Sequence, residues 1–322
     1  MSAPAAAEAT PATAGAGALL GRRVTVKVPA TSANLGPGFD TLGLALAQYD
    51  ELEIEVVAAG LDIEVHGVGE GEVPLDASHL VVRAMAHAFA RFGRDLPPLR
   101  LVAHNSIPHG RGLGSSGAAI VAGVMAAKGL LAPEVEISPD ELLELATELE
   151  GHPDNVAPAL FGGLTIAWVT PEGPRHKKLM VHRGVSPLVL VPEQEMSTAL
   201  ARSLQPQSVP HEDAVFNVSR SALLVAALIQ SPELLLAATE DKLHQNYRAE
   251  AMPETDRLIR RLREAGHPAV VSGAGPSILV LASDPAERAD AARLVEDTAD
   301  TVWQALPLAV DFLGATVAPV VD

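Results

Sequence analysis

One segment of the chain, Pro108-His-Gly-Arg-Gly-Leu-Gly-Ser-Ser-Gly-Ala-Ala119, places four glycines and two serines ahead of a long run of small residues. Glycine lets the backbone take positive φ and approach an anion closely, and the N–H groups at the start of the next helix carry the positive end of its dipole. A serine hydroxyl can add a ligand to Mg²⁺. The segment therefore predicts a phosphate site, with a plain glycine-rich turn as the simpler alternative.

Two familiar phosphate loops fit this segment poorly. No lysine follows the last glycine, so the lysine of a Walker A loop is missing. Gly112-Leu-Gly-Ser-Ser-Gly117 matches G-x-G-x-x-G, but that fingerprint needs a strand ending immediately before its first glycine, and residues 107–111 stand in the way. A dinucleotide-binding dehydrogenase is therefore the weaker alternative.

Acidic residues gather at the end of a well-marked helix. Ser138-Pro-Asp-Glu141 combines an N-cap serine, a proline at the first helical position and a capping-box glutamate, which predicts a helix to about Glu150. Glu148 and Glu150 then face the negative end of the helix dipole, a position that a bound cation would stabilise. Ordinary solvated charge is the alternative for either glutamate. The polar turn His152-Pro-Asp-Asn155 follows directly.

Two further glycine-rich loops could approach a ligand. Asn34-Leu-Gly-Pro-Gly-Phe-Asp40 presents an amide and a carboxylate on a rigid loop, which suits substrate binding, although both side chains could instead satisfy their own turn. Val270-Val-Ser-Gly-Ala-Gly-Pro-Ser277 interrupts an apolar stretch, so its backbone must approach something closely. That neighbour is either a ligand or the first glycine-rich loop.

Elements of both kinds must position these loops. A strand is expected at 24–28, a hairpin from 52–57 and 61–65 around Gly60, and helices at 78–92, 115–131 and 138–150, with a further strand at 99–103. Beyond a boundary near Gly184, strands are expected at 187–191 and within 269–282, and helices at 219–229, 232–243, 254–265 and 285–296. We expect an α+β chain with a disordered Ala/Pro-rich tail at 1–20, one domain at 21–184 and another at 185–322.

Composition narrows the class of protein. The 322 residues carry 40 acidic and 23 basic side chains, and a net charge of −17 disfavours nucleic-acid and membrane-surface partners. Cysteine is absent, which excludes thiolate chemistry. No run of 18 apolar residues predicts a membrane span, and residues 1–20 lack the features of a signal or transit peptide, so a cytoplasmic protein is expected.

Taken together, the motifs resemble those of the GHMP kinase superfamily of small-molecule kinases, in the expected order and from Arg22 to the C-terminus. Within it, residues 29–40, 151–158 and 196–202 are similar to the homoserine kinase family. The resemblance implies a GHMP kinase fold, with an N-terminal ribosomal-protein-S5-like domain that binds ATP, a ferredoxin-like C-terminal domain, and the nucleotide in the cleft between them.

The resemblance also implies roles for individual residues. Ser116 would hold Mg²⁺ together with Glu150, with Ser115 as a further candidate ligand, and Ser116, Glu150 and Asp40 form the implied catalytic set. The ATP phosphates would be wrapped by Pro108, His109, Gly110, Arg111, Gly112, Leu113, Gly114, Ser115, Ser116, Gly117 and Ala118. The amino-acid substrate would be bound by Asn34, Asp40, His152, Arg202 and Arg248, the arginines being suited to its α-carboxylate.

The implied reaction is in-line transfer of the γ-phosphoryl group of ATP to the side-chain hydroxyl of L-homoserine, giving O-phospho-L-homoserine for threonine biosynthesis. A homodimer is expected, because dimers are common among such kinases. Asn155 stands where mevalonate kinase has an aspartate, so either Asp40 helps or no protein base is used. The short link from Glu150 to His152 leaves Glu148 as the alternative metal ligand. Other acceptors (mevalonate, shikimate or a sugar) and a non-catalytic sensor stay open.

Overall fold

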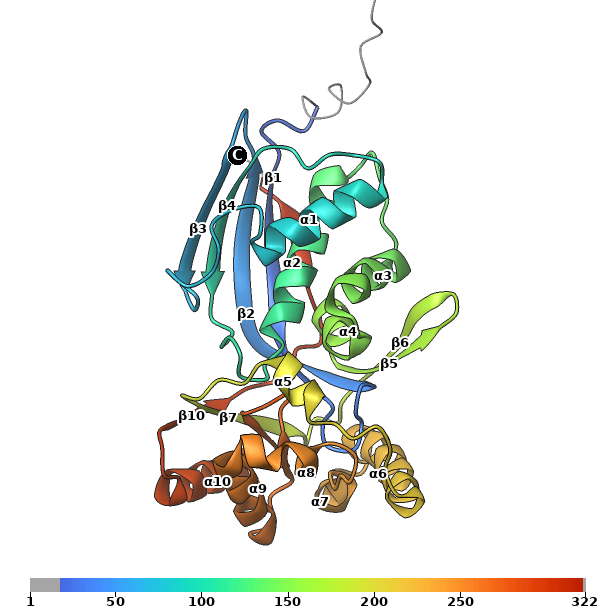
Figure 1. Cartoon of the computed structure of the whole chain (residues 1–322), viewed down its shortest axis with the longest axis vertical. Helices are drawn as coiled ribbons and strands as arrows, with labels where there is room; N and C mark the ends of the chain where they lie inside the picture. Colours follow the sequence, from blue (N-terminus) through green and yellow to red (C-terminus); the bar gives the residue numbers. More distant parts are fainter. Residues whose placement is uncertain (1–17, 321–322) are drawn as a thin grey trace, which may run out of the picture.

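The computed structural model describes residues 18–320, which form two β-sheets with helices packed on them (Figure 1). The larger, seven-stranded sheet contains β1 Arg23–Ala33, β2 Leu42–Val56, β3 Leu61–Gly67, β4 Leu99–Asn105, β5 Leu164–Thr170, β6 Gly173–Leu179 and β11 Thr316–Pro319. Its helices are α1 Leu80–Arg91, α2 Ser115–Leu131, α3 Pro139–Glu150 and α4 Pro153–Phe161.

The smaller sheet has four strands in the order β10-β7-β9-β8. They are β7 Ser186–Pro192, β8 Ala269–Val271, β9 Ile278–Ala282 and β10 Trp303–Pro307. The helices of this half are α5 Thr198–Ser203, α6 His211–Ile229, α7 Leu235–Ala238, α8 Gln245–Arg248, α9 Pro253–Glu264 and α10 Pro285–Thr298, with 3₁₀ turns η2 Pro232–Leu234 and η3 Ala249–Ala251.

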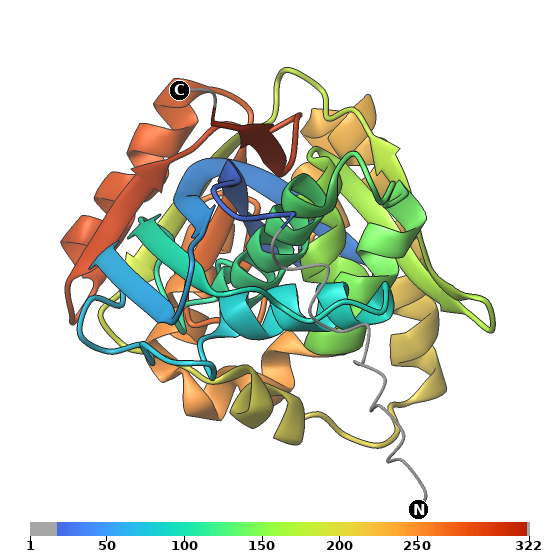
Figure 2. The same cartoon turned by 90° about the horizontal axis from the view of Figure 1, so that it is seen from above.

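The expected hairpin between residues 52–57 and 61–65 is wrong. The strand order is β11-β1-β2-β4-β3, so β4 separates β2 from β3, and β3 runs parallel to β4. The reason is that α1 connects β3 to β4. A helical crossover joins parallel strands, and it lets the apolar side of α1 pack on α2 (Figure 2). Period-two alternation identifies the strands but carries no information about which neighbour each one takes.

Both ends of the described part of the chain, residues 18–320, lie at the larger sheet. Residues 1–17 of the expected tail lie outside the described residues, but Leu19 is already part of the core, with 2% of its surface exposed. At the other end, β11 pairs antiparallel with β1. The division of the chain at residue 184 stays a prediction: β6 ends at Leu179 and β7 begins at Ser186.

The central strands of the smaller sheet are buried on both faces, which explains their continuous apolar sequences. In β7, Leu188 and Leu190 pack with α9 and α10, whereas Val189 and Val191 join the core of the larger sheet. β9 alternates in the same way. Because side chains point to opposite faces in turn, this sheet connects two apolar clusters and ties the two halves of the chain together.

The predicted starts of α3 and α10 are correct, and a side-chain cap marks each of them, whereas α5, which Ser197 caps, was not predicted. α3 begins after Ser138, which accepts a hydrogen bond from the Glu141 backbone while the Glu141 side chain returns one, as the capping box requires. The helix expected at 232–243 is wrong in length, because α7 ends at Ala238. Asp241 accepts hydrogen bonds from the backbone of Leu243 and two following residues, which starts α8 instead.

Within residues 18–320, no helix is both long and apolar enough to span a bilayer.

Helix α2 is the expected small-residue helix, and its close packing generates a stability prediction. A Cβ at Gly123 would collide with the backbone oxygen of Val81 in α1. Gly123→Ala should therefore lower the free energy of unfolding by about 2 kcal/mol, although alanine is normally the better helix former. Urea unfolding followed by circular dichroism measures this. An unchanged or higher free energy of unfolding would show that α1 and α2 are not in this contact.

Candidate active site between the two sheets

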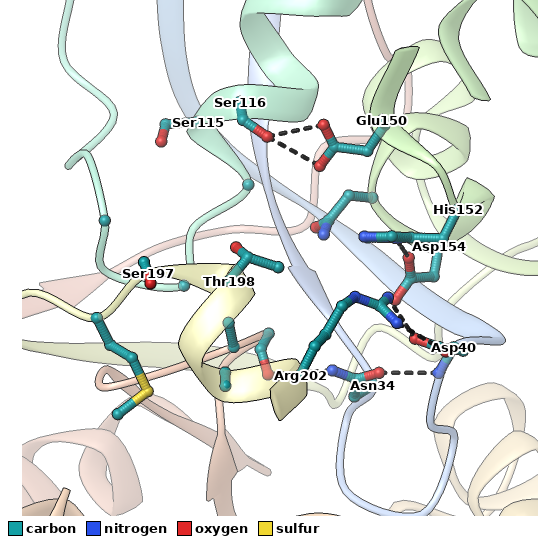
Figure 3. Close-up of a pocket in the computed structure, with 18 of the residues that line it drawn as sticks. Asn34, Asp40, Ser115, Ser116, Glu150, His152, Asp154, Ser197, Thr198 and Arg202 are labelled. Atoms are coloured by element: carbon teal, nitrogen blue, oxygen red, sulfur yellow. Dashed lines mark hydrogen bonds and ion pairs between the residues drawn. The ribbon is translucent and has the colours of Figure 1, made fainter. Parts of the chain in front are cut away.

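A cavity of about 190 Å³ lies where the two halves meet, and it brings together segments far apart in the sequence (Figure 3). The β1–β2 loop, the glycine-rich loop before α2, the turn between α3 and α4, helix α5 and the loop between β8 and β9 all reach it. The predicted substrate and metal residues all line it: Asn34, Asp40, Ser115, Ser116, Glu150, His152, Arg202 and Arg248.

The glycine-rich loop is shaped for close approach to an anion. Gly110, Gly112 and Gly114 all have positive φ, between 62° and 74°. A Cβ at Gly112 would collide with the Ser272 carbonyl, and one at Gly114 with the Thr31 hydroxyl, so only glycine fits. Helix α2 begins at the next residue with no side-chain cap, which leaves its first N–H groups available to a ligand.

The second glycine-rich loop packs on the first one, which is one of the two neighbours that the sequence allowed, and Gly273 and Ala274 of this loop also line the cavity. The Ser272 hydroxyl lies 2.7 Å from the Gly112 carbonyl oxygen. The Gly273 carbonyl accepts hydrogen bonds from Asn34 Nδ2 at 3.0 Å and from Arg248 Nη1 at 3.1 Å. One backbone oxygen therefore orients two of the predicted substrate residues.

Ser116 and Glu150 meet across the cavity wall. The Ser116 hydroxyl lies 2.9 and 2.7 Å from the two carboxylate oxygens of Glu150 (Figure 3). Burial raises the pKa of Glu150, and the bond from Ser116 opposes that shift. Glu148 faces away from the cavity, with its carboxylate 2.7 Å from His87 Nε2 and 2.5 Å from Arg91 Nη2 in α1. Only Glu150 of the two glutamates reaches the site.

The oxygen donors of Ser116 and Glu150 suit Mg²⁺. This ion prefers hard oxygen ligands, keeps several waters and often shares its shell with substrate phosphates. Among residues 18–320, no group of three or more His, Asp or Glu side chains is placed to hold a metal by itself. The chain therefore offers a partial shell, which fits a cation that arrives with a phosphate ligand.

The β1–β2 loop is held in an unusual backbone conformation. Asn34, Leu35 and Asp40 have φ of 70°, 50° and 53°, and such positions in non-glycine residues cluster at ligand sites. Asn34 Oδ1 accepts a hydrogen bond from the Asp40 backbone N–H, so this amide also stabilises its own turn. Arg202 of α5 binds both carboxylate oxygens of Asp40, at 2.9 and 3.3 Å.

Arg248 is a buried cation at the base of the cavity. It is 2% exposed, its guanidinium carbon lies 5.4 Å from the centre of the Phe39 ring, and it makes no ion pair within the described residues. Burial, assisted by the charge of Arg202, lowers its pKa to about 10, so the side chain stays protonated at neutral pH. A buried guanidinium without a carboxylate partner is a natural anion site.

His152 is oriented by a residue that the sequence analysis did not single out. Its Nδ1 is hydrogen-bonded to Asp154, which is 1% exposed. Burial lowers the pKa of His152, but the bond and charge of Asp154 outweigh it, and the pKa is raised overall. Asn155 Oδ1 accepts a hydrogen bond from Thr31 Oγ1 at 2.9 Å. A histidine two residues before an aspartate at a helix start was the available signal.

A second, largely apolar cavity of about 260 Å³ adjoins the first and shares Ser115 and Ser116 with it. Its walls come from β1, β2, β4, the loop before α1, and one side of α2. Apart from His109, Ser115, Ser116 and Ala118, its residues were missed from the sequence. Most of them are ordinary core residues such as Val28, Leu52 and Ala103, and no motif distinguishes them from core.

The predicted phosphate loop divides between the cavities. Gly110, Gly112 and Gly114 line the first, and His109 and Ala118 line the second. The four residues that line neither cavity are Pro108, Arg111, Leu113 and Gly117. The guanidinium of Arg111 instead donates to the Pro192 and Glu193 carbonyls and so attaches the loop to the end of β7, and Leu113 is fully buried.

Comparison with known proteins identifies the class. Residues 79–163 match the family model "GHMP kinases N terminal domain", and residues 223–300 match "GHMP kinases C terminal". The expected α+β GHMP kinase fold is therefore confirmed, and the dehydrogenase alternative is wrong, since residues 106–111 separate β4 from Gly112. The chain is a GHMP kinase.

Individual relatives narrow this class further. The chain is 73% identical to "Homoserine kinase" of Leifsonia xyli subsp. xyli, over 94% of both chains, and 72% identical to "Homoserine kinase" of Clavibacter michiganensis subsp. michiganensis, over 92% of this chain and 94% of the other. The crystal structure of homoserine kinase from Cytophaga hutchinsonii superposes with a TM-score of 0.80 at 26% identity, covering 92% and 97% of the two chains. The chain belongs to the homoserine kinase family.

Glu148 and Glu150 offer a matched pair of substitutions. Glu150→Gln should reduce kcat/KM by about 100-fold or more, because it removes charge from the proposed metal position. Glu148→Gln should leave kcat/KM within about twofold, because its partners lie in α1, away from the cavity. Steady-state kinetics at varied Mg²⁺ measures both. Equal losses in the two variants would contradict the assignment of Glu150.

Proposed function

We propose that the second, apolar cavity binds the nucleotide of ATP, that the first, polar cavity binds L-homoserine, and that the chain transfers the γ-phosphoryl group from one to the other. As a member of the homoserine kinase family, it is a kinase that forms O-phospho-L-homoserine on the route to threonine. The observation that carries the placement of both ligands is that the cavities meet at Ser115 and Ser116, at the end of the anion-binding loop. A nucleotide with its base in the apolar cavity would direct its phosphates toward the polar one.

Charge supports this arrangement of the amino acid. Arg248 has no carboxylate partner among the described residues and suits the α-carboxylate of homoserine, and Asp40 suits its ammonium group. Arg202, which binds Asp40, and His152 complete the wall around the acceptor. A sugar would need no buried guanidinium, and mevalonate has no ammonium group for Asp40. The four groups together favour an α-amino acid.

Mg²⁺ would be held by Ser116 and Glu150, with Ser115 as a further candidate ligand, and when bound it would neutralise charge on the phosphates. The protein side chains would then contribute orientation and exclusion of water. Asp40 is held by Arg202 through both carboxylate oxygens, and Asn155 carries no carboxylate. This arrangement supports transfer without a protein base. The proton of the homoserine hydroxyl would then pass to an oxygen of the transferred phosphoryl group.

We also propose that the enzyme works in the cytoplasm as a homodimer. The proposal on location follows from its biosynthetic reaction, which draws on the ATP and amino-acid pools of the cell interior. The dimer follows from the GHMP kinase family. Size-exclusion chromatography with light scattering tests the dimer directly.

An acceptor panel tests the proposed reaction. ADP formation with Mg-ATP should occur with L-homoserine and should stay at the no-acceptor level with mevalonate, shikimate and galactose. The physical reason is the zwitterion-specific set of Asp40 and Arg248. Turnover with another acceptor would retain the kinase and overturn the substrate. Silence with every acceptor would favour the non-catalytic sensor, in which Ser116 and Glu150 have no evident use.

Arg248 tests the carboxylate site. Arg248→Lys should raise the KM for homoserine by about 10-fold or more, because an ammonium group cannot reproduce bidentate binding, and should leave the KM for ATP within about twofold. Arg263→Lys is the matched control: this partly buried guanidinium binds the Thr239 hydroxyl and the Leu236 carbonyl outside both cavities. A similar rise in the homoserine KM of both variants would point to general destabilisation instead.

A further inference from the structure

His244 is a fully buried histidine that lines neither of the two cavities. It stands immediately before α8, the short helix that carries Arg248. Its Nε2 lies 2.7 Å from the carbonyl oxygen of Gly36 and 3.7 Å from Oδ2 of Asp241. Both of these neighbours can only accept a hydrogen bond, so Nε2 carries the ring proton and donates it to Gly36.

The rest of the ring's surroundings agree with this tautomer. Burial lowers the pKa of His244 against the opposing charge of Asp241, so the ring is neutral. Its Nδ1 is closed off from solvent and has no hydrogen-bond partner within residues 18–320. A neutral imidazole has a single N–H, and the acceptors lie at Nε2. The Gly36 carbonyl therefore receives a hydrogen bond of fixed direction.

The segment that His244 holds is the β1–β2 loop, which presents Asn34 and Asp40 to the first cavity. Gly36 lies between these two residues, and its φ of 87° continues the left-handed stretch that begins at Asn34. Such backbone is unfavourable in non-glycine residues and persists only where the surrounding structure holds it. A bond to the Gly36 carbonyl therefore fixes the middle of a strained loop.

The face of the His244 ring supports the same loop. It stacks on the ring of Phe39, with 5.0 Å between the ring centres and 21° between the planes. Phe39 precedes Asp40 in the chain and lines the first cavity, and the guanidinium carbon of Arg248 lies 5.4 Å from the centre of its ring. One phenyl ring thus contacts both His244 and the side chain proposed to bind the α-carboxylate.

Helix α8 also holds the loop between β8 and β9. Gln245 Oε1 accepts a hydrogen bond from the Val271 backbone N–H at 2.7 Å, and Arg248 Nη1 donates to the Gly273 carbonyl at 3.1 Å. Through His244 the same helix reaches the β1–β2 loop. The region of α8 therefore joins the two loops between which the acceptor side chains are placed.

Helix α6 provides a second attachment for the β1–β2 loop. Asn217 Nδ2 and the Ser221 hydroxyl both donate to the Pro37 carbonyl, at 2.8 and 2.5 Å. These bonds remain when His244 is replaced. A substitution at His244 should therefore displace the loop within the folded protein rather than detach it.

We propose that His244 is a positioning residue for the acceptor, and that it holds the β1–β2 loop at the distance from Arg248 that an α-amino acid requires. The inference rests on the acceptor placement proposed above. Because His244 lines neither cavity, it acts only through the residues that do. Groups that are fixed before binding lower its entropic cost, and a small displacement of such groups weakens binding strongly.

Replacing His244 separates this role from a merely structural one. His244→Leu keeps a large apolar side chain but leaves the Gly36 carbonyl without its donor. The variant should raise the KM for homoserine by about 10-fold, and it should leave the KM for ATP and the kcat within about twofold. Steady-state kinetics with each substrate varied in turn measures this. General destabilisation of the fold would change the constants for both substrates.

Two amide variants test the hydrogen bond itself. The glutamine amide takes the place of Nε2, whereas the asparagine amide takes the place of Nδ1 and does not reach Gly36. His244→Gln should restore most of the homoserine affinity, and His244→Asn should behave like His244→Leu. His267→Leu is the matched control, since His267 is 8% exposed, has an unpartnered Nδ1 and lies outside both cavities. It should leave the KM for homoserine within about twofold.

Three kinetic results would overturn the proposal. They are a folded His244→Leu enzyme with the wild-type KM for homoserine, an equal rise in the KM for ATP, and a glutamine variant that behaves like the leucine variant. If the variants do not fold, ¹⁵N NMR of the wild-type histidines decides. The His244 proton should lie on Nε2, and homoserine should shift that resonance. A proton on Nδ1 or an unshifted resonance overturns the proposal.

Failure of the proposed function gives different results. If the reaction is wrong, the wild-type enzyme forms no ADP with homoserine. If only the acceptor placement is wrong, Arg248→Lys leaves the KM for homoserine unchanged. Failure of the present inference alone leaves the wild-type reaction and the effect of Arg248→Lys intact.

Discussion

The contact between the two glycine-rich loops is the constraint on which the active site depends. Gly112 has no side chain, so the Ser272 backbone can lie against it, and the Ser272 hydroxyl bonds to its carbonyl. The neighbouring Gly273 carbonyl then accepts from Asn34 and Arg248. One short stretch of backbone from the smaller sheet thereby positions the glycine-rich loop before α2 and two side chains that line the first cavity. A side chain at Gly112 would separate the halves of the site at this point.

The site concentrates positive charge inside an acidic protein. The chain carries a net charge of −17, yet Arg202 and Arg248 both line the first cavity. Arg202 is neutralised by Asp40, whereas Arg248 donates to the Gly273 carbonyl and has no carboxylate partner among residues 18–320. Burying a guanidinium in this way is unfavourable without an anion. The free energy that burial of the Arg248 guanidinium costs in folding would be recovered when a carboxylate binds to it. The negative net charge of the protein disfavours binding of anions elsewhere on its surface.

Helix ends assemble the remaining groups. α2 begins at Ser115 and directs its N–H groups at the shared mouth of the two cavities, and α3 ends at Glu150 beside Ser116. A glutamate at the negative end of a helix is unfavourable alone, and its neighbour Glu148 is stabilised by His87 and Arg91. The Glu150 carboxylate instead accepts from the Ser116 hydroxyl, and the charges of His152 and Arg202 also stabilise it. Glu148 and Glu150, which only Leu149 separates, therefore have different surroundings.

The sequence by itself determined those features that depend only on residues close to one another along the chain. Glycine spacing predicted the loop ahead of α2, the capping box at Ser138 predicted the start of α3, and the motifs together predicted the family and the acceptor residues. It could not determine that β4 separates β2 from β3, nor that Glu150 rather than Glu148 reaches the cavity, nor that core residues such as Val28 and Leu52 line a second cavity. Strand neighbours, the direction of a side chain from a helix end and the walls of a cavity depend on contacts between distant segments, which only tertiary packing decides.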